Sequence, residues 1–286
     1  MCLSLHAALV SGWSDLSPPP HATATNQPVV LIATKGPRHY TCASAFSFYR
    51  QGANVTIIMT DSAIGVLSIV ATPIGNMEDI TLRALRTLRE ADYVLCEDTR
   101  TTGNLLKHHG ITNKLKRYDA HASESTHLTI INDIKNGKSV AMVSDAGTPG
   151  VSDPGVLLIQ QARKEGLRID AIPGPSAITT AISIAGIAGN QFSFLGFVPS
   201  KKGRETFFKT LTTFSQPVVF FESTHRIMKS LDQLASHYPD ATLYIGRELT
   251  KMHEEMLVGT PADVLAILEA TPVKQKGEFV VIVSQG

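Results

Sequence analysis

From residue 66 onward, short apolar runs alternate with longer stretches in which apolar residues recur every three or four positions. Short apolar runs are typical of buried strands, and the wider spacing is typical of helices with one buried face. Alternation of the two predicts βαβ units and a mostly parallel sheet. In the first half of this pattern the predicted strands are 66–71, 93–96, 139–143 and 167–172.

Capping residues predict where the first helices begin and end. Asn76 can cap a helix whose first turn is acidic, with Leu82, Leu85 and Leu88 on its buried face. Further helices are predicted before Gly110, from about 123 to 136, and between Pro154 and Gly166.

The second half of the pattern predicts another α/β domain, with a mixed sheet. A helix of small residues over 177–189 marks the boundary, so the expected domains are 66–176 and 177–286. The predicted strands here are 192–197, 217–221, 242–245 and 278–283, and the predicted helices include 224–237 and 261–270.

Residues 1–65 do not follow this pattern. They hold a triple proline at 18–20 and no stretch with an apolar helical stripe, so we expect a poorly structured extension. One hypothesis is that Met59 is the natural start of the protein, directly before the first strong strand.

The composition narrows the classes of protein that fit. The chain of 286 residues is 43% hydrophobic with a net charge of +1, which argues against gripping nucleic acid mainly through bulk positive charge. Its three cysteines, Cys2, Cys42 and Cys96, form no CxxC pair and no metal-ligand spacing, so neither disulfides nor a metal site are expected. No apolar stretch is long enough to span a bilayer, and we expect a soluble, cytoplasmic protein.

Four loops follow predicted strands at the edge where ligands bind in parallel sheets. The strongest is 144–155, which packs three glycines, two prolines and two aspartates directly after a buried strand. That density favours a backbone path close to a ligand over an ordinary surface turn. The other three loops, each of which also suits a plain turn or helix cap, are 72–76, 97–100 and 173–177.

Seven motifs, in this order and spacing, resemble the 16S rRNA cytidine 2′-O-methyltransferase family, which belongs to the tetrapyrrole-methylase fold class. They are VATPIGNMEDITLRAL, EDTR, SDAGTPGVSDPG, IPGPSA, FESTHR, RELTK and KGEFVVIV. The resemblance covers residues 66–286. It implies a two-domain α/β homodimer that holds S-adenosylmethionine in the cleft between its domains and acts on 16S rRNA in the small ribosomal subunit.

Matched position by position, the resemblance implies a set of cofactor-binding residues: Pro73, Gly75, Asp145, Gly147, Thr148, Pro173, Gly174, Ser176 and Ala177. Relatives that methylate carbon atoms carry a Gly-Asp-Pro where this chain has Gly147-Thr148-Pro149, which favours the RNA branch. The extension 1–65 has no counterpart in the family, and several relatives continue beyond the point that corresponds to Gly286.

Methyl transfer to a hydroxyl benefits from a general base and a nearby cation, and it requires no metal. The catalytic candidates are Glu97, Asp98 and Arg100, with either carboxylate as the proton acceptor. For the RNA we expect contacts from Lys201, Lys202, Arg204, Arg226 and Arg247. For FESTHR, a helix N-cap by Ser223 or Thr224, with Glu222 and Arg226 paired locally, is an equally open interpretation.

Two other functions compete with this one. A methyltransferase acting on a tetrapyrrole carbon would share the fold and the cofactor. A non-catalytic nucleotide-binding module on the ribosome would keep the cleft without the chemistry, but the charged set at 97–100 argues against it.

Overall fold

The computed structural model describes residues 47–50, 53–56 and 65–285, except 121, 153, 154 and 188. Residues 1–62 and 63–286 form two separate units. The described part of the first unit is an antiparallel hairpin of β1 (Ser47–Arg50) and β2 (Ala53–Thr56). The possible start at Met59 and the helix opening at Pro154 lie outside the described residues. Among the helices described, none is long and apolar enough to cross a membrane.

The first sheet of the second unit is parallel throughout, with strand order β5-β4-β6-β3-β7. This confirms the predicted βαβ pattern, and β4 coincides with the predicted run 93–96. The strands are β3 (Val66–Val70), β4 (Tyr93–Cys96), β5 (Leu115–Arg117), β6 (Ser139–Met142) and β7 (Arg168–Ile172).

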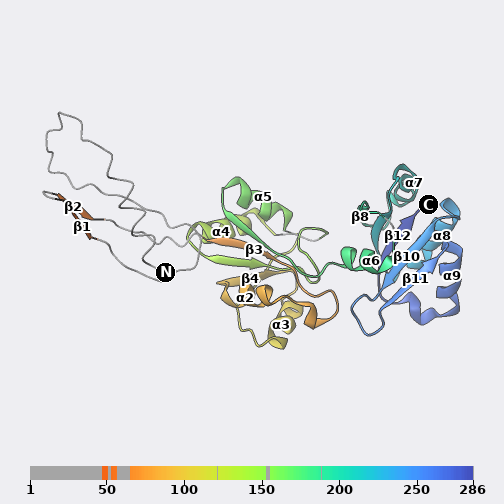
Figure 1. Cartoon of the computed structure of the whole chain (residues 1–286), viewed down its shortest axis with the longest axis horizontal. Coiled ribbons are helices and arrows are strands. Elements are labelled where there is room, and N and C mark those ends of the chain that lie inside the picture. Colours follow the sequence, from red (N-terminus) through yellow and green to blue (C-terminus); the bar gives the residue numbers. More distant parts are fainter. Residues whose placement is uncertain are drawn as a thin grey trace. The chain divides into compact units, whose positions relative to one another are not determined.

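Helices cover both faces of this sheet (Figure 1). On one face, α2 (Leu82–Glu90) and α3 (Thr99–His108) bury leucines against β3, β4 and β6. On the other, α4 (Glu124–Lys135) and α5 (Val156–Lys164) pack isoleucines and a leucine against the same strands. Because both faces are covered, the strand tips are the part of the sheet left open to a ligand.

The start of α2 differs from the sequence prediction. Asn76 caps only a short 3₁₀ turn, η1 (Met77–Asp79), and Thr81 caps the α-helix itself by accepting a hydrogen bond from the Ala84 N–H. With this register Ala84 and Leu88 face the core, whereas Leu82 is 85% exposed. The prediction that Leu82 belongs to the buried face is therefore wrong.

The second sheet is mixed, with strand order β11-β10-β12-β9-β8, and only the β8–β9 pair is parallel. This confirms the prediction of a second, mixed α/β layer. The strands are β8 (Ser193–Phe197), β9 (Val218–Ser223), β10 (Thr242–Arg247), β11 (Glu255–Gly259) and β12 (Glu278–Ser284).

Helices cover both faces of the second sheet as well. One face carries α7 (Arg204–Thr210), α8 (Ile227–His237) and α9 (Pro261–Ala270), whose apolar residues form its main core (Figure 1). The other face packs against α6 (Ala177–Ala185), the helix predicted at the boundary. Short 3₁₀ turns complete this region at η2 (Leu211–Thr213) and η3 (Pro272–Gln275).

Strands β1, β2, β5 and β11 and the bounds of helix α7 were not predicted from the sequence. Each is short or rich in charged residues, so its apolar pattern is weak. Both sheets lie within the single unit 63–286, and the predicted domain boundary at 176/177 stays a prediction.

Candidate functional site

Hydrogen bonds tie the predicted ligand loops together at the tips of the first sheet. Thr72 and Gly147 exchange both backbone hydrogen bonds, at 2.9 and 3.0 Å, so the first and third loops form an isolated bridge. The buried Thr72 hydroxyl also donates to the Ser144 carbonyl at 3.2 Å. Gly147 has φ +78°, a conformation that favours glycine, so this bridge depends on the residue type at 147.

The second and fourth loops join the same network. The Asp98 N–H donates to the Asp145 carboxylate at 3.2 Å, which links the second loop to the third. The Thr148 hydroxyl donates to the Pro175 carbonyl at 3.2 Å, which links the third loop to the fourth. All four loops singled out in the sequence are therefore neighbours in the structure.

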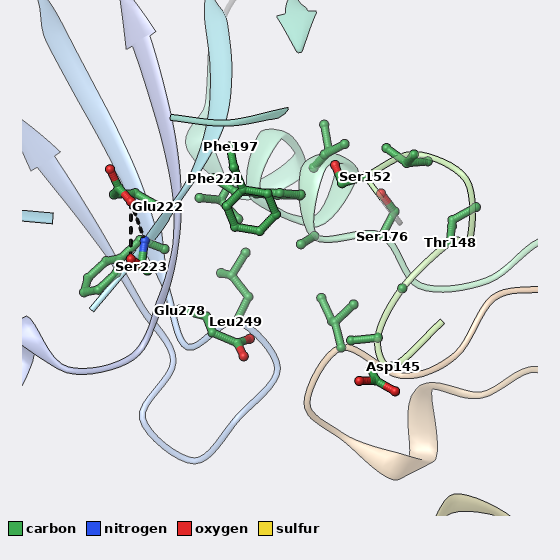
Figure 2. Close-up of a pocket in the computed structure, with 18 of the residues that line it drawn as sticks. Asp145, Thr148, Ser152, Ser176, Phe197, Phe221, Glu222, Ser223, Leu249 and Glu278 are labelled. Atoms are coloured by element: carbon green, nitrogen blue, oxygen red, sulfur yellow. Dashed lines mark hydrogen bonds between the residues drawn. The ribbon is translucent and has the colours of Figure 1, made fainter. Parts of the chain in front are cut away.

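A pocket of about 450 Å³ opens beside this network and is closed by residues of the second sheet (Figure 2). Pockets of 300–1,000 Å³ are the ordinary size range of small-molecule sites. Its lining is Ile74, Glu97, Asp145, Ala146, Gly147, Thr148, Val151, Ser152, Ser176, Ala177, Ile178, Phe197, Phe221, Glu222, Ser223, Leu249, Glu278, Phe279 and Val280.

The structure brings six of the predicted site residues together in this lining: Glu97, Asp145, Gly147, Thr148, Ser176 and Ala177. Four other predicted residues do not line the pocket: Pro73 and Gly75 flank the lining residue Ile74, and Pro173 and Gly174 come shortly before Ser176. Two of them are sites of close backbone approach. A Cβ on Gly174 would lie 3.0 Å from the Ala71 Cβ, and a Cβ on Gly75 would lie 2.5 Å from the Lys251 Cγ. These two glycines shape the loops.

The beginning of α6 contributes backbone donors to the pocket. Ser176 is the N-cap residue of α6, but its side chain makes no capping hydrogen bond. The first N–H groups of a helix have no partner within the helix and carry partial positive charge. The pocket thus offers donors for an anionic group at Ser176 and Ala177, and the carboxylate of Asp145 for a cationic one.

Asp98 and Arg100 are occupied with each other. The Asp98 carboxylate caps α3 by accepting from the Arg100 N–H at 2.8 Å, and it pairs with the Arg100 guanidinium at 2.6 Å. The hydrogen bond from the Arg100 side chain, more than any other influence, lowers the pKa of Asp98 to about 2. A carboxylate with so low a pKa is a weak base near neutral pH. Of the two candidate bases, Glu97 lines the pocket and Asp98 does not.

Arg204 and Arg226 surround the buried carboxylate of Glu222. Arg226 Nε lies 3.0 Å and Arg204 Nη1 lies 3.4 Å from its oxygens, and the Ser230 hydroxyl donates to it at 2.6 Å. Arg204 also donates to Ser230 and Gln233, and its side chain is buried. Glu222 pairs with Arg226, as the local interpretation of FESTHR predicts, but the expected N-cap by Ser223 or Thr224 is wrong, because Arg226 is the N-cap residue of α8 and no side chain caps this helix. The burial of Arg204 disfavours a contact with RNA.

Arg247 is likewise buried and used inside the protein. Its guanidinium donates to the backbone carbonyls of Val273, Lys274, Lys276 and His253 and pairs with Glu255 at 3.2 Å. No part of this side chain is placed to hold a phosphate. Lys201 and Lys202, by contrast, are exposed in the turn before α7 and remain predicted RNA contacts.

Sequence reasoning missed the pocket residues of the second sheet: Phe197, Phe221, Ser223, Leu249, Glu278, Phe279 and Val280. Most belong to predicted strands, so the apolar pattern identified their element but not their exposure to a cavity. Among the described residues, no three His, Cys, Asp or Glu side chains form a group that could hold a metal ion.

An α/β fold with one parallel sheet, one mixed sheet and a pocket at the strand tips is typical of a known class of protein. A family model described as "Tetrapyrrole (Corrin/Porphyrin) Methylases" matches residues 66–265. Solved structures of this shape include a cobalt precorrin-4 methyltransferase, at TM-score 0.58 and 17% identity over 79% of this chain and 97% of that one. Diphthine synthase matches at TM-score 0.60 and 16% identity over 77% of this chain and 90% of that one. At such identities the likeness shows the fold alone.

Curated relatives narrow the class. The "Ribosomal RNA small subunit methyltransferase I" of Thermotoga maritima is 42% identical over 221 residues, which span 77% of this chain and 99% of the relative. The protein of the same name from Escherichia coli O157:H7 is 39% identical over 225 residues, or 78% of this chain and 79% of the relative. The chain belongs to the ribosomal RNA small subunit methyltransferase I family. The resemblance carried by the seven motifs is confirmed.

Proposed function

We propose that this chain transfers a methyl group from S-adenosylmethionine to the ribose 2′-oxygen of a cytidine in 16S rRNA of the small ribosomal subunit. The observation that carries the proposal is the 42% identity across 99% of the Thermotoga relative, whose name gives that class of substrate. The motifs behind the 2′-oxygen assignment supply the loops that meet at the pocket. The same resemblance implies a homodimer, which light scattering on the pure protein tests.

The pocket suits S-adenosylmethionine in size and in chemistry. Its volume of about 450 Å³ lies within the range of cofactor sites. The cofactor carries a positive sulfonium, an ammonium and a carboxylate. Asp145 would hold a cationic group, and the open N-terminus of α6 at Ser176 and Ala177 would hold the carboxylate. When bound, it supplies a methyl group on a positively charged sulfur.

Several residues of the pocket work by position. Gly147 and Thr148 bind their neighbouring loops by hydrogen bonds, which fixes the wall against which the cofactor would lie. Ile74, Ile178 and Leu249 supply apolar surface that excludes water. Fixing the acceptor oxygen in line with the reacting carbon lowers the entropic part of the barrier.

Glu97 is the proton acceptor in this proposal. It lines the pocket directly after β4, whereas the neighbouring Asp98 does not line it. The Glu97 carboxylate would accept the proton of the ribose hydroxyl as that oxygen is methylated. Arg100 keeps Asp98 in place as the cap of α3.

The test uses the purified full chain, labelled S-adenosylmethionine and two acceptors. The first acceptor is small ribosomal subunits from a strain that lacks the modification, and the second is uroporphyrinogen. We expect label in the ribose of rRNA. Label in the macrocycle would instead establish a tetrapyrrole methyltransferase, and cofactor binding without transfer to either would establish a binding module.

Two neighbouring substitutions then locate the base. Glu97→Gln should lower kcat by at least about a hundredfold, because a general base contributes factors of that size. Asp98→Asn, a matched change that keeps a good helix cap, should lower it much less. Affinity for S-adenosylhomocysteine, measured by calorimetry, should stay unchanged in both variants. A larger loss in Asp98→Asn than in Glu97→Gln would reverse the assignment.

A further inference from the structure

An aromatic side chain without an assigned role stands in the wall of the pocket. Phe197, the last residue of β8, lines the cavity and is 55% exposed. Leaving a phenylalanine ring in water forgoes the hydrophobic stabilisation that its burial would give. An exposed ring in the wall of a pocket is therefore available to contact a ligand.

An irregularity in the sheet aims this ring at the pocket. Phe194 pairs with Val219, so regular pairing would bring Phe197 opposite Glu222, but Phe197 pairs with Phe221 instead. One extra residue in β8 accounts for the shift. Side chains alternate between the faces of a strand, so without the extra residue Phe194 and Phe197 would point to opposite faces. The bulge puts both on the face of Phe221.

Gly196 makes the bulge possible. Its φ of +70° lies in the left-handed region, which residues with a Cβ adopt only with strain. A Cβ at 196 would meet no atom within 4 Å, so the backbone conformation and not lack of space requires glycine. Bulges that re-aim a side chain are common next to functional sites.

Other aromatic rings brace Phe197 from behind. Its ring centroid lies 5.2 Å from that of Phe221 at an interplanar angle of 59°, and Phe221 in turn makes an edge contact with Phe194 at 5.0 Å. Figure 2 shows Phe197 and Phe221 next to each other, with Asp145 and Thr148 across the pocket. Such tilted contacts are favourable and hold the outermost ring in a defined position.

The buried charge cluster holds the backbone that follows the ring. Arg226 donates to the Val198 carbonyl at 2.8 Å, and Arg204 donates to the Pro199 carbonyl at 3.5 Å. Both guanidinium groups are fixed by Glu222. Glu222 and Arg226 of the FESTHR motif, together with Arg204 of α7, thus help to fix the segment directly after Phe197.

We propose that Phe197 is the platform on which the target nucleobase stacks, in the reaction proposed above and resting on that proposal. The Phe197 ring packs against Phe221 and is still 55% exposed, and the exposed Lys201 and Lys202 follow it in the chain. This segment therefore combines an aromatic face with two cations. That combination is the usual one for unpaired nucleotides, because every base has a π face and every nucleotide a phosphate. The base stacks on Phe197, and the two lysines bind flanking phosphates.

The experiment compares four variants in full-length protein: Phe197→Ala, Phe197→Tyr, Phe197→Leu and, as the control, Phe192→Ala. Phe192 is a second exposed phenylalanine, 43% exposed, that does not line the pocket. Each variant is assayed for methylation of unmodified small subunits and for binding of S-adenosylhomocysteine by calorimetry. Melting temperatures check that all four are folded.

Phe197→Ala should lower kcat/KM for the subunits roughly tenfold to a hundredfold, the loss associated with one base stacked on an aromatic ring. Phe197→Tyr should retain most of the activity, and Phe197→Leu should fall between the two, because it keeps apolar area without a π face. Affinity for S-adenosylhomocysteine should stay within about twofold of wild type in all variants, and Phe192→Ala should match wild type throughout.

Two results would overturn the inference. An equal loss of S-adenosylhomocysteine affinity in Phe197→Ala would assign the ring to the cofactor, and a wild-type kcat/KM in Phe197→Ala would leave it with no role in substrate binding. Failure of the wild-type protein to methylate small subunits is a separate outcome, and it counts against the proposed function.

Discussion

The two sheets of the unit 63–286 build their walls of the pocket in different ways. The parallel sheet contributes loops at its strand tips, and backbone hydrogen bonds between Thr72, Gly147 and their neighbours hold these loops together. The mixed sheet contributes side chains from a bulged strand and a buried group of charges around Glu222. One wall therefore depends on backbone conformation, and the other on which side chains the fold buries.

The largest expected effect comes from breaking the charge group of the mixed sheet. Glu222→Ala removes the carboxylate with which both Arg204 and Arg226 form ion pairs, so each guanidinium group loses this acidic partner. Removing one partner of a buried ion pair costs about 3–5 kcal/mol of stability. For a unit of this size that lowers Tm by roughly 10 °C, which scanning calorimetry measures.

A matched pair of controls separates charge from packing. Glu222→Gln keeps the volume and one acceptor oxygen, so it should lose less than Glu222→Ala. Glu205→Gln removes an exposed carboxylate from α7, where it pairs with Lys209, and should leave Tm unchanged within error. If Glu222→Ala melted with wild type, the buried cluster would have no part in holding the second wall.

This difference between the walls decides what the sequence could predict. Glycine and proline restrict or permit particular backbone conformations, so they mark the loops at 72–76, 144–155 and 173–177 as candidate ligand loops. Residues of all three loops line the pocket. The sequence does not show whether a charged side chain is exposed or is buried against a partner of opposite charge. Arg204 and Arg247 were expected to face RNA, but both lie buried against carboxylates or carbonyl oxygens.

The bulge in β8 was not predicted from the sequence. The apolar run 192–197 predicted a strand, but nothing in strict alternation signals the extra residue that turns Phe197 to the pocket. Gly196 was the available clue, because a glycine inside a strand pattern often marks a bulge. Strand β11 was not predicted, because the apolar run within it, 256–258, is only three residues long.

The next effect in size tests the wall made of loops. Asp145→Asn keeps an oxygen that can accept from the Asp98 N–H but removes the negative charge from the pocket. We expect S-adenosylmethionine to bind about tenfold more weakly, because a charge-assisted contact becomes a neutral one in a partly exposed site. Calorimetry measures the change in Kd. An unchanged Kd together with wild-type turnover would remove Asp145 from the cofactor site.

A smaller effect concerns how acid weakens the parallel sheet. Asp133 on α4 accepts from Lys138 Nζ at 2.6 Å and from the Tyr93 hydroxyl at 2.9 Å. The hydrogen bond from Lys138, more than any other influence, lowers the pKa of Asp133. A depressed pKa means that the charged form stabilises the fold above the unfolded value of about 3.9. That stability is lost as the pH falls through the folded pKa.

Asp133→Asn should therefore lower Tm at pH 7 by about 2–4 °C, the shift that roughly 1 kcal/mol produces in a unit of this size. Between pH 5 and pH 3 its Tm should fall less steeply than that of wild type, because the group that takes up a proton is gone. Parallel curves for the two proteins over this interval would show that Asp133 does not contribute to acid sensitivity.

The smallest expected effect tests the register of α2, where the sequence prediction was wrong. Thr81 caps this helix, and in the resulting register Ala84 and Leu88 are buried in the core. The Leu82 side chain is 85% exposed. Leu82→Gln should change the free energy of unfolding by no more than about 0.5 kcal/mol, as surface substitutions do. Leu88 is also a leucine of this helix, but it is fully buried. Leu88→Ala should lower the free energy of unfolding by about 2–5 kcal/mol, because it opens a cavity in the core. Urea unfolding of the two variants measures both values. Similar losses in both would mean that α2 turns Leu82 inward, and the capping by Thr81 would then not fix its register.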